Sequence, residues 1–316
     1  MKKYKLLGRF SISILLSILV LLMAACSPSS ATSISQGNSS ISSFKASMGK
    51  LTFAGLKNSG DQYEIFTLDL VSNNLVQVTK NGFADISPSW SPDGKKIIYS
   101  SNVNATYALF SMDADGTNQN QIHQSRGLDE TQPVWSSDGA RIAYQSNASG
   151  QMDIYVLTLN SDSQPLRLTV NTAQNTQPAW SPDGAKIAYV SNNSSSFNIY
   201  IMNADGTNET RLTKDLSYDS SPVWSPDGKQ IAFISRRDPD KHFQLFTINT
   251  DGSSEKQLTN GDDTIHSPAW SPDNKTIAFI ASSTSENRLQ VFDIASQQIL
   301  NVDTSLYDYA GLSWTK

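Results

Sequence analysis

The sequence is poor in the residues that most often carry chemistry. Among 316 residues it has one cysteine, Cys26, and three histidines, His123, His242 and His266. A single cysteine excludes an intrachain disulfide, and the histidines lack metal-site spacing. We find no G-x-S-x-G elbow, no H-E-x-x-H and no P-loop. We therefore expect no enzyme here, although a Ser-His-Asp site is defined by geometry and stays open.

Long apolar runs are also scarce, and the only one, Ile12–Met23, lies at the N-terminus. Basic residues precede it and small residues follow it, which predicts a secretory signal peptide over residues 1–25. The segment Met23-Ala24-Ala25-Cys26 resembles a bacterial lipobox, so Cys26 is the expected lipidated first residue of the mature chain. An ordinary cleaved signal or an uncleaved anchor helix is the alternative. Lipidation would place the protein on the outer side of the cytoplasmic membrane, or in the periplasm or outer membrane.

Removal of the signal would leave 20 Lys and Arg residues against 29 Asp and Glu, a formal net charge of −9 in place of −5. A net acidic body argues against nucleic-acid binding. Residues 26–48 are rich in serine, and Lys45 is their only charged residue. This composition predicts a flexible tether before a folded domain over residues 49–316.

Six tryptophans recur at intervals of 44 to 46 residues, which is typical of a repeat architecture. They are Trp90, Trp135, Trp180, Trp224, Trp270 and Trp314. Each of the first five stands in a segment such as QPAWSPDGAKIAYVS, and four short strands can be read in each unit. Pro and Gly make the turn after the Trp strand, and an Asp-Gly pair makes a second hairpin. Four antiparallel strands per period predict a blade of a β-propeller.

The two ends of the domain complement each other. The last unit, Gly311–Trp314, stops where a second strand should begin, and Gly49–Ala54 reads as that missing strand. Residues 64–68 and 75–79 supply the third and fourth strands. We therefore predict an all-β fold, a six-bladed propeller whose ring closes when the N-terminal strands pair with the Trp314 strand. A monomer is expected.

The repeated P-x-W-S-P-D-G, I-Y-x-M-x-x-D-G and R/Q-L-T segments resemble the propellers of the TolB family, and those of the dipeptidyl peptidase IV and prolyl oligopeptidase type. The resemblance covers residues 49–316. TolB has an α/β domain before its propeller and is soluble, whereas this chain has a short tether and a lipobox. The peptidases carry a separate hydrolase domain that is not seen here. The resemblance therefore implies a TolB-like propeller lipoprotein, without implying a role in a Tol system.

A candidate ligand site lies at one mouth of the central channel. Polar residues stand five positions before four of the tryptophans, and near neighbours occur in the last two units. These residues are Asp85, Glu130, Asn175, Asp219, His266 and Asp308. Carboxylates around an axis would favour a polar ligand or Ca²⁺, and no other cofactor is expected. The alternative is that they hydrogen-bond the backbone of turns before the Trp strand.

Loops of unequal length share this face, and variable loops on a rigid scaffold often bind partners. The most charged of them contains Arg236, Arg237, Lys241 and His242, which we interpret as a partner-binding loop; a solvated loop that pairs its own charges is the alternative. The sequence thus favours an envelope-anchored binding or scaffold propeller for a protein, peptide or glycan. The other functions considered are a hydrolase or lyase with a metal at the channel mouth, and a sensor ectodomain.

Overall fold

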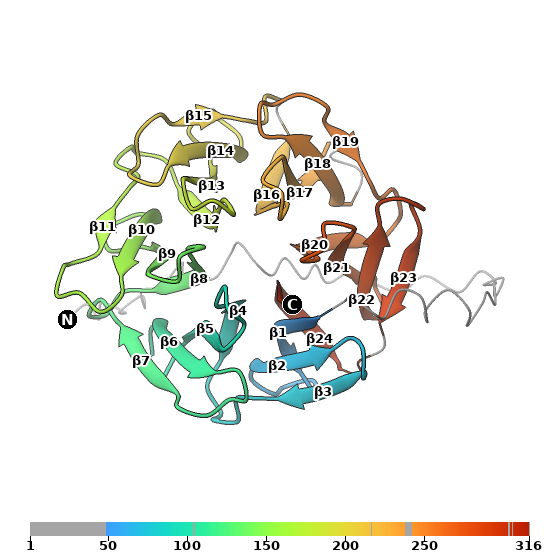
Figure 1. Ribbon diagram of the computed structural model, residues 1–316, viewed down its shortest axis with the longest axis horizontal. Helices are drawn as coiled ribbons and strands as arrows, with labels where there is room; N and C mark the ends of the chain where they lie inside the picture. Colours follow the sequence, from blue (N-terminus) through green and yellow to red (C-terminus); the bar gives the residue numbers. More distant parts are fainter. Residues whose placement is uncertain are drawn as a thin grey trace, which may run out of the picture. The chain divides into compact units, whose positions relative to one another are not determined.

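A computed structural model describes residues 49–103, 105–215, 217–237, 242–302, 304 and 306–315. The predicted signal peptide, Cys26, the tether and Lys241 lie outside these residues. The described part forms six four-stranded antiparallel sheets around a central axis, so the predicted fold is confirmed (Figure 1). Within it, no helix has the length and hydropathy that a membrane crossing requires.

Each sheet is one blade, and in five of the six the strands are numbered outward from the axis. Blade I consists of β4 (Asp85–Trp90), β5 (Lys96–Ser101), β6 (Ala108–Asp113) and β7 (Asn120–His123). Blade II consists of β8 (Glu130–Trp135), β9 (Arg141–Ser146), β10 (Asp153–Thr158) and β11 (Leu166–Arg167). Blade III consists of β12 (Asn175–Trp180), β13 (Lys186–Ser191), β14 (Asn198–Asn203) and β15 (Thr210–Arg211). Blade IV consists of β16 (Tyr218–Trp224), β17 (Gln230–Arg236), β18 (Gln244–Asn249) and β19 (Lys256–Gln257). Blade V consists of β20 (Thr264–Trp270), β21 (Thr276–Ser282), β22 (Asn287–Asp293) and β23 (Ile299–Val302).

The sixth sheet joins the two ends of the domain, and we call it the closing blade. It consists of β24 (Asp308–Thr315), β1 (Lys50–Leu56), β2 (Glu64–Asp69) and β3 (Asn74–Gln77), in this order from the axis. Strand β1 pairs with β24 in antiparallel register, with Leu51 opposite Trp314. Because β24 also contacts both β4 and β20, the ring is continuous. The predicted closure is therefore confirmed.

The hydrophobic core lies between blades. The second strand of a blade carries a small residue on one face and a large one on the other, and both faces are buried. Ala188 of blade III packs in one cluster with Phe233 of blade IV, and Ala232 of blade IV packs with Phe279 of blade V. Each aromatic ring is fully buried, which contributes about 2 to 3 kcal/mol. Small residues opposite large ones let neighbouring sheets approach closely.

Each innermost strand has a β-bulge at the third residue before its Trp. In β4 the register shifts between Ile86 and Ser89, and Ser87 has φ of 53°. The same left-handed conformation, with φ from 51° to 62°, recurs at the equivalent residues Gln132, Gln177, Ser221, Ser267 and Gly311. Such a conformation is strained for residues other than glycine. The bulge bends the strand and redirects its side chains.

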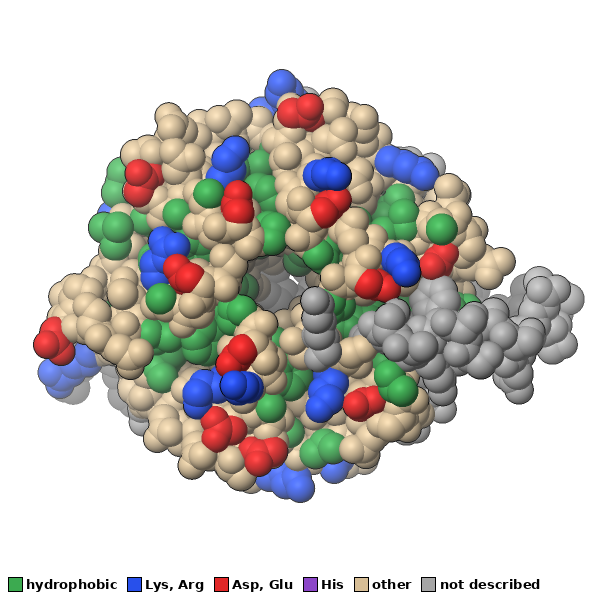
Figure 2. All heavy atoms as spheres, viewed as in Figure 1, with side chains coloured by type: hydrophobic (Ala, Val, Ile, Leu, Met, Phe, Trp, Pro, Cys, Tyr) green, Lys and Arg blue, Asp and Glu red, His purple; other side chains and the backbone are tan. Residues whose placement is uncertain are grey.

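The blades present two different ends. Turns between the first and second strands and between the third and fourth form the regular-loop face, and the remaining connections form the variable-loop face. The Ser-Pro-Asp-Gly turns place acidic and basic side chains together, such as Asp227 Oδ2 and Lys229 Nζ at 3.7 Å. Figure 2 shows such acidic and basic neighbours around a central hollow.

Candidate functional site

Four of the six candidate residues at the channel mouth are buried between blades. Asp85, Glu130, Asn175 and Asp219 are each 0% exposed. Each lies at the start of an innermost strand, where it meets the third strand, the outer strand or the connecting segment of the preceding blade. We call these contacts junctions and name them by the two blades that they join.

At the I–II junction the carboxylate of Glu130 meets a histidine. Glu130 Oε1 and Oε2 lie 2.8 and 3.0 Å from His123 Nδ1. Glu130 Oε1 also accepts hydrogen bonds from the Ser125 hydroxyl at 2.7 Å and the Ser125 N–H at 3.0 Å. The carboxylate oxygens of the buried Glu130 thus both have hydrogen-bond partners within the chain.

At the II–III junction Asn175 contacts a buried acid of the preceding blade. Asn175 Nδ2 donates to Asp153 Oδ1 at 3.0 Å. Asp153 also accepts from the Thr169 hydroxyl at 2.7 Å and pairs with Arg167 Nη2 at 2.7 Å. Here the cation comes from the outer strand.

The junction between the closing blade and blade I holds two acids. Asn81 links them, because its N–H donates to Glu64 Oε1 at 3.1 Å and its Nδ2 donates to Asp85 Oδ2 at 2.8 Å. Burial raises the pKa of Asp85, and the charge of Glu64 raises it further. In the described ranges of the chain no cationic side chain pairs with either acid.

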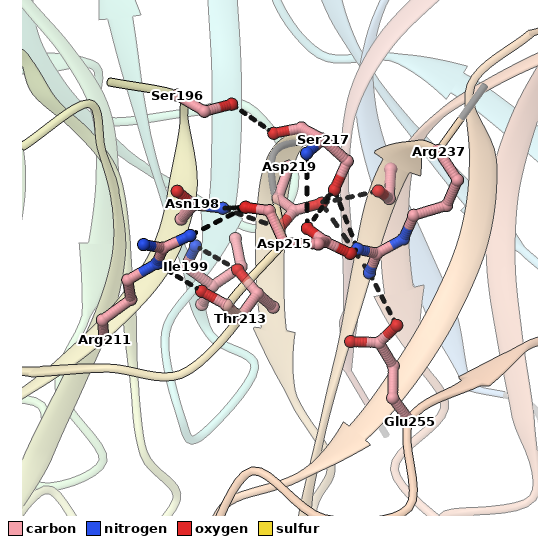
Figure 3. Close-up of polar contacts among 11 residues, drawn as sticks. Ser196, Asn198, Ile199, Arg211, Thr213, Asp215, Ser217, Asp219, Arg237 and Glu255 are labelled. Carbon is pink, nitrogen blue, oxygen red and sulfur yellow. Dashed lines mark hydrogen bonds and ion pairs between the residues drawn. The ribbon is translucent and has the colours of Figure 1, made fainter. Parts of the chain in front are cut away.

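At the III–IV junction Asp219 belongs to a network around Arg237 (Figure 3). Arg237 forms ion pairs with Asp215, with Asp219 at 3.9 Å and with Glu255 at 2.8 Å. Its guanidinium stacks 4.9 Å from the ring centre of Phe246. Burial raises the pKa of Asp219, while a hydrogen bond from the Ser235 hydroxyl lowers it. Arg237 is therefore held by acids of blade IV and of the connection from blade III, and partner binding by this residue stays a prediction.

His266 and Asp308 lie at the last two mouth positions and are only half-buried. His266 Nε2 is 2.9 Å from Ser282 Oγ, and Nδ1 is 3.3 Å from Ser267 Oγ. Burial lowers the pKa of His266 to about 4. Asp308 accepts hydrogen bonds from Asn287 Nδ2 at 2.7 Å and from the Tyr63 hydroxyl at 2.5 Å.

The distance of 2.9 Å between Ser282 Oγ and His266 Nε2 is within the range expected for a catalytic nucleophile and its general base. A triad also needs a group that orients the other ring nitrogen, usually a carboxylate. That nitrogen faces the Ser267 hydroxyl instead, and a base with a pKa near 4 is a weak proton acceptor at neutral pH. The contact therefore fits a structural hydrogen bond better than an acyl-transfer site.

The six mouth residues thus serve separate junctions. Across the residues that the structure describes, no group of three or more His, Cys, Asp or Glu is placed to hold a metal ion. Binding of Ca²⁺ or a polar ligand at these positions stays a prediction, and for the four fully buried residues the junction contacts compete with it.

The bulge residues, which the sequence analysis missed, meet around the axis. Gln177 Oε1 accepts from the N–H of Ser221 at 2.7 Å, and Ser267 Oγ accepts from the N–H of Gly311 at 3.1 Å. A Cβ on Gly311 would lie 3.3 Å from Ser87 Cα. The inner ring is therefore lined by hydroxyls and amides. A signal existed, since five of the six stand directly before the proline of each repeat.

Two further residues of the charged loop are described. The guanidinium of Arg236 lies 5.1 Å from the ring centre of Phe243. His242 is exposed, and its Nδ1 lies 3.1 Å from Thr264 Oγ1. Both lie on the variable-loop face, where they were expected.

Comparisons with known proteins agree with this architecture. Residues 101–311 match the TolB beta propeller domain, PD40. The chain is similar to TolB from Acinetobacter baumannii, with a TM-score of 0.73, 21% identity, and coverage of 84% of this chain and 66% of that chain. It is also similar to a putative TolB from Agrobacterium tumefaciens, with a TM-score of 0.67, 23% identity, and coverage of 82% and 90%.

A puromycin-hydrolyzing peptidase of Mycobacterium tuberculosis shares the fold, with a TM-score of 0.59, 16% identity, and coverage of 83% of this chain and 47% of that chain. No curated protein sequence matches significantly. Structural likeness at these identities shows the fold, whereas the PD40 match spans most of the chain. The chain therefore belongs to the TolB beta-propeller family.

Proposed function

We propose that this protein is an envelope-anchored binding propeller that engages a partner through its variable-loop face. The partner class is a protein, a peptide or a glycan, and the chain acts as a monomer. One observation supports this choice of face: the regular-loop face repeats the same turn, whereas the variable-loop face differs from blade to blade.

The regular-loop turns consume their own polar groups. In blades I and IV the serine hydroxyl donates to the aspartate at 2.7 Å and accepts from the N–H that starts the second strand at 2.9 Å. Hydrogen bonds from that serine lower the pKa of Asp93 and Asp227. Side chains bound in this way have few groups left for a partner.

The variable-loop face exposes apolar side chains on the connections between blades. Phe83, Val170 and Tyr307 are 39%, 78% and 57% exposed. They follow three different outer strands, and their surroundings differ. Exposed aromatic and aliphatic side chains are common in protein interfaces.

Anchoring through Cys26 would keep this propeller at the membrane surface on a Ser-rich tether. The TolB relatives support a protein partner, but their propellers resemble this chain in fold only at these identities. Binding in place of catalysis is proposed because Ser282 and His266 lack an orienting carboxylate.

The test is site-specific photo-crosslinking in the full-length, lipidated protein. A photo-reactive residue at Val170 or Tyr307 samples the variable-loop face, and one at Lys95 or Lys229 samples the regular-loop face. We expect partners to be captured from the first pair of sites only. Equal capture from both faces, or capture from the second pair alone, would overturn the proposal.

Catalysis has its own test. We expect a fluorophosphonate probe to leave Ser282 unlabelled, with the Ser282→Ala variant as the control. Stoichiometric labelling that disappears in this variant would replace the binding function with a hydrolase.

A further inference from the structure

The residue at the end of the second strand can be compared between blades, and this comparison singles out blade IV. In blades I, II and III this strand is followed by Asn102, Asn147 and Asn192. Each Oδ1 accepts the N–H of the residue that precedes the junction residue of the same blade, at 2.8, 3.0 and 2.8 Å. This hydrogen bond ties the second strand to the start of the innermost strand.

Blade IV lacks this asparagine and has Arg236 at the equivalent position. Arg236 is paired in register with Tyr218, which precedes Asp219. An arginine side chain has no acceptor, so the hydrogen bond made in blades I, II and III is lost here. A local structural contact has thus been exchanged for a cation on the variable-loop face.

Arg236 lies on a group of aromatic rings. Its guanidinium is 5.1 Å from the ring centre of Phe243. Tyr218 contacts Phe243 edge to face at 5.6 Å and lies 4.9 Å from Phe197. All four side chains are half-buried. We call Phe197, Tyr218, Arg236 and Phe243 the Arg236 cluster.

The two adjacent arginines have opposite environments. Arg237 meets three acids, whereas no acidic side chain in the described part of the loop and its neighbours pairs with Arg236. Burial raises the pKa of Tyr218 to about 12, so its hydroxyl stays protonated at neutral pH. The cluster therefore offers a fixed cation, a hydroxyl and apolar ring surface together.

We propose that the Arg236 cluster is the docking site for a peptide segment of the protein partner that carries an acidic residue beside an aromatic or aliphatic one. The carboxylate pairs with the guanidinium in a two-pronged geometry, and the apolar side chain packs on Tyr218 and Phe197. An arginine held on an aromatic face loses little conformational freedom on binding, and Arg and Tyr are enriched at the centres of interfaces. The chain is acidic overall, so the attraction is local to this cluster. This inference rests on the proposed function and specifies its partner.

The test uses an array of random octapeptides with a fixed Glu-Phe core and a matched array with Gln-Phe, probed with the full-length protein. We expect at least tenfold stronger retention on the Glu-Phe array. The variant Arg236→Asn introduces the residue of blades I, II and III and should abolish the preference, and Tyr218→Ala should lower retention on both arrays. Lys229→Asn on the regular-loop face is the matched control and should bind as the parent does.

Equal retention of the parent protein on both arrays, or an unchanged preference in Arg236→Asn, would overturn the inference. Thermal melting checks that each variant is folded. If Arg236→Asn does not fold, Arg236→Gln takes its place in the test. Partner capture by photo-crosslinking that persists in folded Arg236→Asn would refute the inference and leave the proposed function standing. If the parent protein captures no partner at any site on the variable-loop face, the proposed function is refuted.

Discussion

Two junctions of the ring hold a buried acid at the same repeat position, but the charged groups around that acid differ. At the III–IV junction Asp219 faces Arg237, which also pairs with Glu255 at 2.8 Å. At the junction between the closing blade and blade I, Asp85 faces Glu64, and the neighbouring groups are neutral hydrogen-bond donors such as Asn81. A repeat therefore specifies where an acid lies without specifying its counter-charge. The III–IV junction is stabilised by the charge of Arg237. The junction between the closing blade and blade I is destabilised by the repulsion between Asp85 and Glu64.

The largest effect is expected at the junction with the cation. Replacing Arg237 by Met should lower the free energy of unfolding by about 3 kcal/mol, because Asp219 and its neighbours lose their counter-charge. Urea denaturation at pH 7 measures this change. The matched control is Lys229→Met, whose partner Asp227 is solvent-exposed and whose effect should be within about 1 kcal/mol. An equal loss in both variants would show that the network does not neutralise buried acid.

His266, on the innermost strand of blade V, sharpens the comparison through pH. Its ordinary pKa of 6.5 falls to about 4 in the folded protein. The unfolded chain therefore binds the proton more tightly, and stability present above pH 6.5 is lost as pH falls toward 4. The loss has an upper bound of about 3 kcal/mol. Denaturant midpoints from pH 7.5 to 4 should show this slope in the parent and a shallower one in His266→Gln; parallel slopes would contradict it.

At the junction between the closing blade and blade I, a neutral substitution should raise the free energy of unfolding, in contrast to Arg237→Met. Asp85→Asn is expected to raise the free energy of unfolding by about 1 kcal/mol at pH 7, because it removes a desolvated charge beside Glu64. Burial also raises the pKa of Asp219, but Arg237 lies 3.9 Å away, so Asp219→Asn should be less stabilising than Asp85→Asn. The comparison collapses if the two substitutions change stability equally.

The pH dependence of this difference provides the finest test. The pKa of Asp85 is raised in the folded state, so its stabilising proton is fully bound below the unfolded pKa and is lost as pH rises through the folded pKa. The stability gap between Asp85→Asn and the parent should therefore shrink as pH falls from 7 toward 4. Taking the gap at each pH cancels the contribution of His266. A gap that is constant with pH would show that Asp85 has the same pKa in the folded and unfolded states, which would contradict the prediction.

Much of the fold could be predicted from local patterns. The tryptophan period, the Ser-Pro-Asp-Gly and Asp-Gly turns and the unmatched ends gave six blades and the pairing of Leu51 with Trp314. Each of these signals acts within a few residues or repeats at a fixed interval. The candidate site was less predictable, since Asp85, Glu130, Asn175 and Asp219 were located on the correct strand ends but turned out to lie between blades. The ion pairs of Arg237 with Asp215 and Glu255 could not be predicted, because these acids are distant from one another in sequence and only the fold brings them together.

The sequence alone determined the number of sheets, the order of strands and the way in which the ring closes, because turn residues and alternating side chains act locally and repeat. The tertiary structure decided which side chains face the channel, the junctions or the solvent. At the bulge before each Trp, a left-handed residue such as Ser87 shifts the alternation of the strand. Where a side chain then points depends on the neighbouring blade, which supplies a cation at one junction and a second acid at another.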